Sequence, residues 1–471
     1  METNKYNKVD AKPVKSFFVE MLTRDIELVD AILDLLDNCV DGILRQGKNS
    51  SSEMPYKGFN AKIKFDENSF SIADNCGGIP WDLHDYAFRM GKESKNRDSN
   101  LPTVGVYGIG MKRAIFKIGK QCLISTRNQE DCYKVEITPE WIAEPDNWDL
   151  PVSESSQPDQ EDGTTIVIDE LNEGIATRFG TENENFTREL TDKIRTHYAF
   201  ILDKGFEVQI NDKQVVAKPT KLIFNKTQNV KGTDTVIKPY IFQAESDDVK
   251  VFLSVGFTRP IPSQEDINDE QEERRYSSID AGWTIICNDR AVLYCDRTEL
   301  TGWGEAGTPR YHTQFIAIAG IVEFQSNDAA KLPTTTTKRG IDASSSLYLQ
   351  VKNRMREGMQ IFTNYTNKWK GNADESKRHI NSGNPYALDE IKKEAENLNL
   401  NSVRSGLRGR QFKPKLPLPR QQEESTEKRI SYNKESDDIQ TVQNYLLMET
   451  EVSPSKVGEE CFDQILKEAQ Q

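Results

Sequence analysis

The sequence is poor in the features that mark secreted, membrane-spanning and metal-binding proteins. It has only four histidines, His84, His197, His312 and His379, and none is near another, which argues against a histidine-rich metal site. The seven cysteines are scattered without a C-x-x-C pair, as expected for reduced thiols in a cytoplasmic protein. No apolar run is long enough to span a membrane, and the first sixteen residues contain no apolar segment typical of a signal peptide.

Length and charge limit the architecture and the classes of partner. A chain of 471 residues has room for two or three domains. Its composition, 36% hydrophobic and 29% charged, is ordinary for a globular protein. The formal net charge of −14 argues against a wholly basic nucleic-acid binder, although a local basic patch is compatible with it.

The first third of the sequence predicts a small sheet covered by helices. Apolar residues recur at three- and four-residue steps between 16 and 45, which predicts a helix. Apolar and polar residues alternate along 62–73 on both sides of a polar turn, which predicts a hairpin. Residues 121–137 contain two more strand-like runs. After an acidic stretch, residues 163–171 return to a strand pattern. Interleaved strands and helices of this kind favour a two-layer α/β sandwich.

The remaining sequence predicts a second α/β region and a helical tail. After a connecting helix over 186–202, strand patterns recur as far as a Thr-rich loop, and a long helix is expected over 346–370. The polar stretch 371–438 is broken by Gly, Pro and charge, which predicts a linker. Two amphipathic helices are expected after it, over 439–448 and 454–469, the second with a capping signal at Ser453-Pro454.

One short motif places polar groups on a single helix face. Asp34, Asn38 and Asp41 are spaced by four and three residues, so they share a face of the predicted helix. A solvated acidic face would explain the spacing as well, but Asn is a poor helix former. Its amide oxygen can ligate Mg²⁺, and the carboxylate of Asp34, one turn earlier, can orient and deprotonate a water molecule.

A second motif follows a predicted strand. Asp74 ends that strand, and its carboxylate could accept a hydrogen bond from the exocyclic amine of a purine. Gly77, Gly78 and Ile79 then turn the backbone and leave room for a base. An ordinary turn between two strands has the same sequence pattern.

The third motif is the most specific of the set. Gly105, Gly108 and Gly110 precede Met111-Lys112 and a helical pattern, so backbone amides and a helix N-terminus could approach phosphate oxygens. The spacing differs from that of a dinucleotide fold, and the G-K-[ST] ending of a P-loop is missing. Lys112 could contact phosphate or could be an ordinary surface charge.

Together with Gly163-Thr164, these motifs resemble the nucleotide site of the GHKL ATPases, which include gyrase B, the ninety-kilodalton heat-shock chaperones, sensor histidine kinases and MutL. The resemblance implies ATP and Mg²⁺ as ligands, with Asp74 on the adenine amine and Thr164 supporting it through water. Most members have Glu where this chain has Asp34, which implies slow hydrolysis. A lysine from the following domain reaches the γ-phosphate in two-domain members, and Lys338 or its neighbour Arg339 is similarly placed. The residues assigned in this way to the nucleotide are Asn38 (also on the metal), Asp41, Asp74, Gly78, Ile79, Met90, Lys95, Gly105, Val106, Tyr107, Gly108, Ile109, Gly110, Met111, Lys112 and Thr164, with Asp34 and Lys338 as catalytic groups.

The same resemblance implies an order of domains. It predicts a GHKL-type α/β two-layer sandwich over 1–175, a transducer-like α/β domain over 176–345, and a helical and linker region over 346–471. The segment from Met90 to Thr103 would form a lid over ATP. The Gly-Ile-Gly-Met-Lys sequence is most similar to MORC-like and heat-shock-chaperone-like members, because MutL has a different motif there and no histidine precedes His84 as in a histidine kinase.

Two functions fit these features. In the first, ATP drives dimerisation of the N-terminal domains in a Mg²⁺-dependent ATPase that acts on DNA or a partner protein, as MORC-like relatives do, some of them in prokaryotic antiviral defence. In the second, the chain is a nucleotide-gated scaffold that hydrolyses ATP poorly and recruits partners through its C-terminal helices. The basic stretch Arg404–Arg420 could bind nucleic acid or an acidic protein surface.

Overall fold

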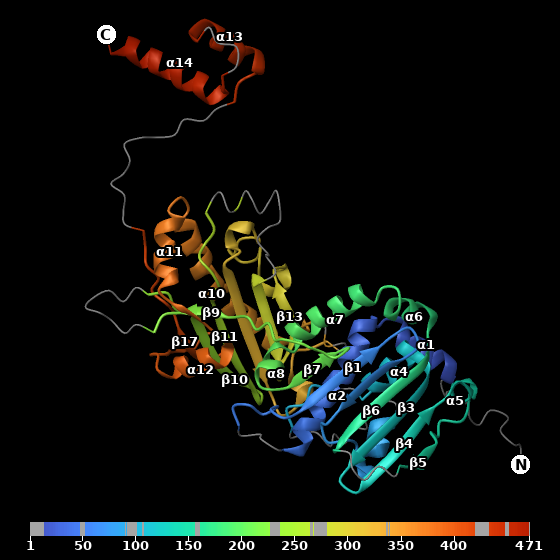
Figure 1. The fold of residues 1–471 in the computed structure, drawn as a ribbon. Helices are drawn as coiled ribbons and strands as arrows, with labels where there is room; N and C mark the ends of the chain where they lie inside the picture. The colour runs from blue at the N-terminus through green and yellow to red at the C-terminus, as the bar shows by residue number, and fades with distance from the viewer. Residues whose placement is uncertain are drawn as a thin grey trace, which may run out of the picture. The chain divides into compact units, whose positions relative to one another are not determined.

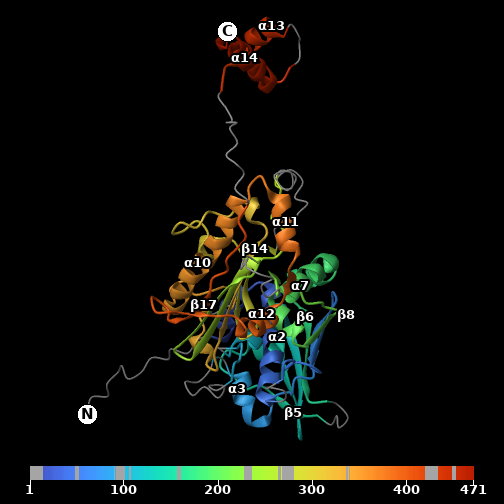
Figure 2. The same cartoon turned by 90° about the vertical axis from the view of Figure 1, so that its left-hand side faces the viewer.

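The computed structural model describes residues 14–47, 52–89, 91, 101–105, 108–155, 161–226, 236–263, 267, 280–335, 338, 340–419, 433–447 and 452–470. The chain divides into two compact units, Met1–Pro419 and Arg420–Gln471. The larger unit contains two large sheets with their helices and a two-stranded sheet, and the smaller one is a helical hairpin (Figures 1 and 2). In the described part of the chain, no helix combines the length and the apolar character needed to cross a membrane.

The first sheet has eight strands in the order β5-β4-β3-β6-β2-β1-β7-β8. Neighbouring strands are antiparallel except β1 and β7, which pair in parallel. Buried and more exposed residues alternate along β1 and β3, so the sheet packs one face against helices. The strands are β1 (Asn60–Phe65), β2 (Phe70–Asp74), β3 (Gly119–Asn128), β4 (Asp131–Ile137), β5 (Val152–Glu154), β6 (Gly163–Leu171), β7 (Glu207–Ile210) and β8 (Lys213–Gln214).

Helices cover one face of this sheet and share a single apolar core with it. Where the sequence predicts one helix over 16–45, the structure has two, because Asp25 ends the first and the buried Ile26 turns the chain into the second. The helices are α1 (Lys15–Arg24), α2 (Leu28–Gln46), α3 (His84–Phe88), α4 (Gly110–Ile118), α5 (Pro139–Ala143), α6 (Glu173–Phe179), α7 (Asn183–His197) and α8 (Ala199–Asp203).

The second sheet has seven strands in the order β13-β12-β14-β11-β10-β17-β16 and is buried on both faces. Helix α10 (Ser346–Lys368) packs on one face, and α8 and α12 (Leu388–Glu396) supply the apolar residues on the other. The strands are β10 (Tyr240–Ser246), β11 (Val249–Phe257), β12 (Gly282–Cys287), β13 (Arg290–Asp296), β14 (Ile318–Gln325), β16 (Asn401–Val403) and β17 (Gly409–Phe412); short 3-10 helices lie at Trp81–Leu83, Glu299–Thr301, Thr313–Phe315 and Ala329–Lys331.

The predicted linker over 371–438 is wrong as far as residue 412. That part contains α11 (Ala373–Asn381), α12 and two strands of the second sheet, while β15 (Asn384–Tyr386) pairs with β9 (Leu222–Phe224). The polar composition misleads because α12 needs few apolar residues to dock: Leu388, Ile391 and Ala395 are buried against the sheet, and Lys392 Nζ lies 2.6 Å from the buried carboxylate of Glu323 on β14. Partners this far apart in sequence leave no local pattern.

The smaller unit consists of α13 (Ser436–Leu446) and α14 (Pro454–Ala469). The capping signal is confirmed, since the Ser453 side chain accepts a hydrogen bond from the backbone NH of Lys456 and Pro454 lies in the first turn. Val457 is buried between the helices. Apolar side chains of this hairpin are nevertheless exposed, namely Tyr445, Phe462, Ile465 and Leu466.

Candidate functional site

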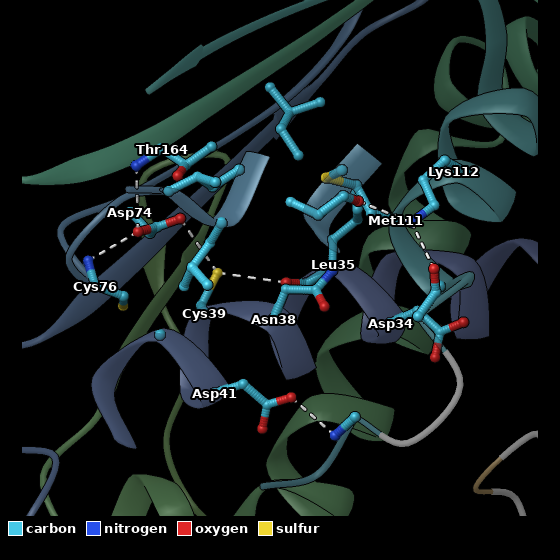
Figure 3. A pocket seen from close by; sticks show the side chains of 18 of the residues that line it. Asp34, Leu35, Asn38, Cys39, Asp41, Asp74, Cys76, Met111, Lys112 and Thr164 are labelled. Atoms are coloured by element: carbon cyan, nitrogen blue, oxygen red, sulfur yellow. Dashed lines mark hydrogen bonds between the residues drawn. The ribbon is translucent and has the colours of Figure 1, made fainter. Parts of the chain in front are cut away.

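A cavity of about 1230 Å³, part of it open to solvent, lies between α2, the ends of β2 and β6, and the start of α4 (Figure 3). Met90, Lys95, Val106, Tyr107 and Arg339 lie outside the described residues. All the other residues that the sequence assigned to nucleotide, metal or catalysis line the cavity, namely Asp34, Asn38, Asp41, Asp74, Gly78, Ile79, Gly105, Gly108, Ile109, Gly110, Met111, Lys112, Thr164 and Lys338.

Helix α2 supplies the acidic side of the cavity. Asn38 is exposed in the middle of a helix that is buried over most of its length, so its amide is open to a ligand. Asp41 is buried, and its two carboxylate oxygens accept hydrogen bonds from the backbone NH groups of Val104 and Gly105, at 2.6 and 2.8 Å. Asp41 therefore fixes the segment that leads into the glycine-rich loop.

Asp74 forms the opposite end of the cavity. One carboxylate oxygen accepts hydrogen bonds from the NH groups of Cys76 (2.8 Å) and Thr164 (3.4 Å), and the other lies 3.5 Å from the thiol of Cys39 (Figure 3). Burial raises the pKa of Asp74 to about 6. The carboxylate is thus held in place and changes charge close to neutral pH.

Glycines let the backbone approach closely around Asp74. Gly78 has a positive φ of 65°, and a Cβ added there would lie 1.9 Å from the carbonyl oxygen of Arg127. The next residue, Ile79, donates its NH to the hydroxyl of Thr126 at 2.8 Å, and that hydroxyl lies 3.2 Å from the hydroxyl of Thr164. This network closes the floor of the cavity.

The glycine-rich loop leads directly into α4. Gly108 has a φ of 69°, and Gly110 begins the helix so close to Asp34 that a Cβ would lie 3.3 Å from that side chain. Lys112 is buried, and its Nζ donates to the carbonyl oxygens of Ala87 (2.8 Å) and Gly108 (2.5 Å). Lys112 therefore ties the glycine-rich loop to the residues that precede the predicted lid.

A cation that sequence reasoning missed faces Asp34. Arg113 Nη2 lies 2.5 Å from Asp34 Oδ2, and Lys338 Nζ lies 3.7 Å from Asp34 Oδ1. Arg113 is on α4, one residue beyond the glycine motif, and its pairing with α2 has no signature in sequence spacing. Lys338 comes from the loop after β14, so the cavity includes a residue of the second sheet region.

Lys338 makes its shortest contact with another carboxylate of α2. Its Nζ lies 2.8 Å from Asp37 Oδ2, whereas Asp37 Oδ1 accepts hydrogen bonds from Tyr198 (2.5 Å) and Arg290 (3.0 Å). Burial would raise the pKa of Asp37, but the charges of Lys338 and Arg290 outweigh it and keep this pKa below its usual value. The sequence assigned no role to Asp37, Tyr198 or Arg290, because these residues and their partners are far apart in the sequence.

All seven cysteines carry free thiols, as the sequence predicted.

Residues 26–174 match the family model described as Histidine kinase-, DNA gyrase B-, and HSP90-like ATPase. The matched segment contains the four motifs, and Lys338 lies outside it. No curated protein matches the chain.

Proposed function

Because residues 26–174 form an ATP-binding domain of the GHKL superfamily, we propose that this chain is a Mg²⁺-dependent ATPase in which ATP closes two N-terminal domains into a homodimer. The observation that carries the proposal is the meeting of Asp34, Asn38 and Lys338 at one cavity, since Lys338 belongs to a different part of the chain. A site that spans two domains can convert the loss of a phosphate into a change of domain position.

The chemistry of the cavity fits ATP from end to end. Asp74, when ionised, can accept a hydrogen bond from the adenine amine, and the amides near Gly108 and Gly110 at the start of α4 suit the phosphates. The amide oxygen of Asn38 suits a hard cation such as Mg²⁺, which would neutralise phosphate charge when bound. In this proposal Asp34 orients and deprotonates the attacking water.

Two contacts must change for this reaction. Asp34 is paired with Arg113 at 2.5 Å, so its carboxylate has to exchange this cation for water before it can act as a base. Lys338 must leave Asp37 to meet the γ-phosphate, which carries more negative charge than a single carboxylate. Both exchanges fit slow hydrolysis that is coupled to domain movement.

The basic stretch over 404–420 is our candidate for the surface that contacts a target molecule. Part of it forms β17, yet Arg404, Arg408, Arg410 and Lys415 are exposed. We infer that this surface contacts DNA or an acidic partner protein, in keeping with the MORC-like branch. Its binding should weaken steeply with salt if phosphates are the target.

ATP turnover with Mg²⁺, measured at several protein concentrations, tests the function. We expect Asp34→Asn to bind ATP but to lose about 10²- to 10⁴-fold in kcat, and Asn38→Ala to lose Mg²⁺-dependent binding. Asp192→Asn, an exposed carboxylate on α7, is the control and should match the wild type. Wild-type activity in Asn38→Ala would overturn the proposal, and activity per molecule that is independent of concentration would exclude dimer coupling.

The second candidate is a nucleotide-gated scaffold. The close pairing of Arg113 with Asp34, and the short reach of Asp compared with Glu, favour a site that holds ATP without hydrolysing it. A single-turnover measurement separates the two functions. A scaffold retains intact ATP for hours, whereas an ATPase converts it within one cycle.

A further inference from the structure

The turn between β12 and β13 reaches into the nucleotide domain. Asn288 and Asp289 have positive φ values of 47° and 65°, as in a two-residue hairpin turn of type I′. Asn288 Nδ2 donates to the carbonyl oxygen of Thr103 at 3.1 Å, next to the segment that Asp41 fixes. Asp289 accepts from Tyr56 at 2.9 Å and pairs with Lys204 at 2.6 Å. These contacts join the turn to three separate segments of the chain, two of them in the nucleotide domain.

Arg290 follows the turn and makes the most buried ion pair in this region. Its Nε lies 3.0 Å from Asp37 Oδ1, and the side chains of Arg290 and Asp37 are 5% and 1% exposed. The guanidinium also lies over the ring of Tyr198 at 4.3 Å and donates to the carbonyl oxygen of Ala291 at 2.9 Å. Arg290 is therefore held by several contacts and is not free to move alone.

The two oxygens of Asp37 have different kinds of partner. Oδ1 is bound by Arg290 and Tyr198, which are both well packed. Oδ2 is bound by Lys338, which also lines the nucleotide cavity and lies 3.7 Å from Asp34. Within the described residues, Lys338 is thus the one cation that could leave Asp37 for a ligand.

We propose that Arg290 is a positioning residue, which keeps Asp37 neutralised so that Lys338 can exchange this carboxylate for the γ-phosphate of ATP. The inference rests on the proposed role of Lys338. Leaving a buried carboxylate without a counter-charge is strongly unfavourable. Without Arg290, Lys338 would be the sole compensating cation for Asp37 and would be retained there. With Arg290 present, the buried charge stays paired in both positions of the lysine.

The test is a rescue experiment on ATP turnover in the full chain. Arg290→Met should reduce kcat by about tenfold or more, because Lys338 is then held by Asp37. The double variant Arg290→Met, Asp37→Asn removes the charge that holds the lysine, so it should recover most of the lost kcat. Arg178→Met is the matched control, since Arg178 pairs with Glu189 at a more exposed position near the same helices and should have wild-type kcat.

The outcomes separate the inference from the function on which it rests. An unchanged kcat in Arg290→Met, or a double variant no more active than Arg290→Met, would overturn the inference, because Asp37→Asn removes the charge that is proposed to hold Lys338. The kcat is compared per folded molecule, so that a loss of stability alone does not count as a loss of kcat. If Arg290→Met does not fold, the kcat of the double variant still tests the inference, because that protein contains no unpaired buried carboxylate. Lys338→Ala is measured beside them, and wild-type kcat in that variant would overturn the role of Lys338 itself.

Discussion

At the residue scale, Asp74 is a titratable group at the end of the cavity where we propose that adenine binds. Its pKa is raised to about 6 by burial, so the carboxylate is mostly ionised at pH 7.5 and mostly protonated at pH 5. Only the ionised form accepts a hydrogen bond from the adenine amine through either oxygen. We expect the affinity for ATP to fall as the pH drops below about 6, approaching tenfold per pH unit.

Titration of ATP binding between pH 7.5 and 5 measures this effect. Asp74→Asn is the control, because it cannot titrate and reports any contribution from protonation of the nucleotide itself. The wild type should lose more affinity than this variant across the window. Parallel curves for the two proteins would show that Asp74 does not contact the base in its ionised form.

Substitutions at two glycines separate the free-energy cost of a positive φ from the cost of a steric clash. Gly47 and Gly78 have nearly the same positive φ, 64° and 65°, but Gly47 has open space at the Cβ position. Gly47→Ala should therefore cost about 1 kcal/mol of unfolding free energy from conformation alone. Gly78→Ala places its Cβ 1.9 Å from the carbonyl oxygen of Arg127, so it must shift the strand end beside Asp74.

Chemical denaturation and ATP binding should both be measured on these two variants. We expect Gly78→Ala to be the less stable and to lose ATP affinity, while Gly47→Ala retains it. Equal effects of the two substitutions would mean that the backbone at Gly78 relaxes away from Arg127 without disturbing the cavity.

At the element scale, α12 is docked on the second sheet by one of two adjacent lysines. Lys392 pairs with Glu323, which is almost fully buried, whereas Lys393 pairs with Glu53 between exposed side chains. Lys392→Met leaves a buried carboxylate with weaker compensation, which should cost about 2 kcal/mol in view of the partial exposure of Lys392. Lys393→Met should leave stability unchanged.

Thermal unfolding of these two single variants checks the docking of α12. A lower Tm for Lys392→Met only is the expected result. Equal Tm values for both variants would show that the apolar residues of α12 hold the helix without help from the ion pair.

Helices and strands with a long apolar period are the elements that the sequence can predict. The β1–β2 hairpin and α10 were predicted because their apolar residues follow the strand and helix periods over a long enough window. Helix α12 and strand β17 were missed, since each adds few apolar residues to a core built mainly by strands far away in sequence. At the cavity, residues within short motifs were found, whereas Arg113, Arg290 and Tyr198 depend on packing between elements.

At the scale of the whole molecule, the cavity lies entirely within the larger compact unit, between Asp34 and Lys338. A chain that ends at Pro419 should therefore keep the wild-type ATP affinity and the main unfolding transition. What it loses is the exposed apolar surface of the hairpin, which includes Tyr445, Phe462 and Ile465. We expect partner recruitment to be lost while ATP binding stays.

Titration calorimetry compares the ATP affinity of the truncated and full chains. Scanning calorimetry compares their main unfolding transitions. The matched control is the full chain with Tyr445→Ser, Phe462→Ser and Ile465→Ser, which changes the apolar surface without shortening the protein. A weaker ATP affinity in the truncated chain alone would contradict the division into units that function separately.

The parallel pairing of β1 with β7 has a consequence for how the protein is made. Strand β7 follows all four nucleotide motifs in the chain, yet it hydrogen-bonds to a strand that precedes most of them. A ribosome adding about 5–20 residues per second therefore exposes β1 as an open edge for several seconds before residue 210 emerges. A gene fragment that stops at residue 174 would encode every motif and still leave that edge bare, as a template for aggregation.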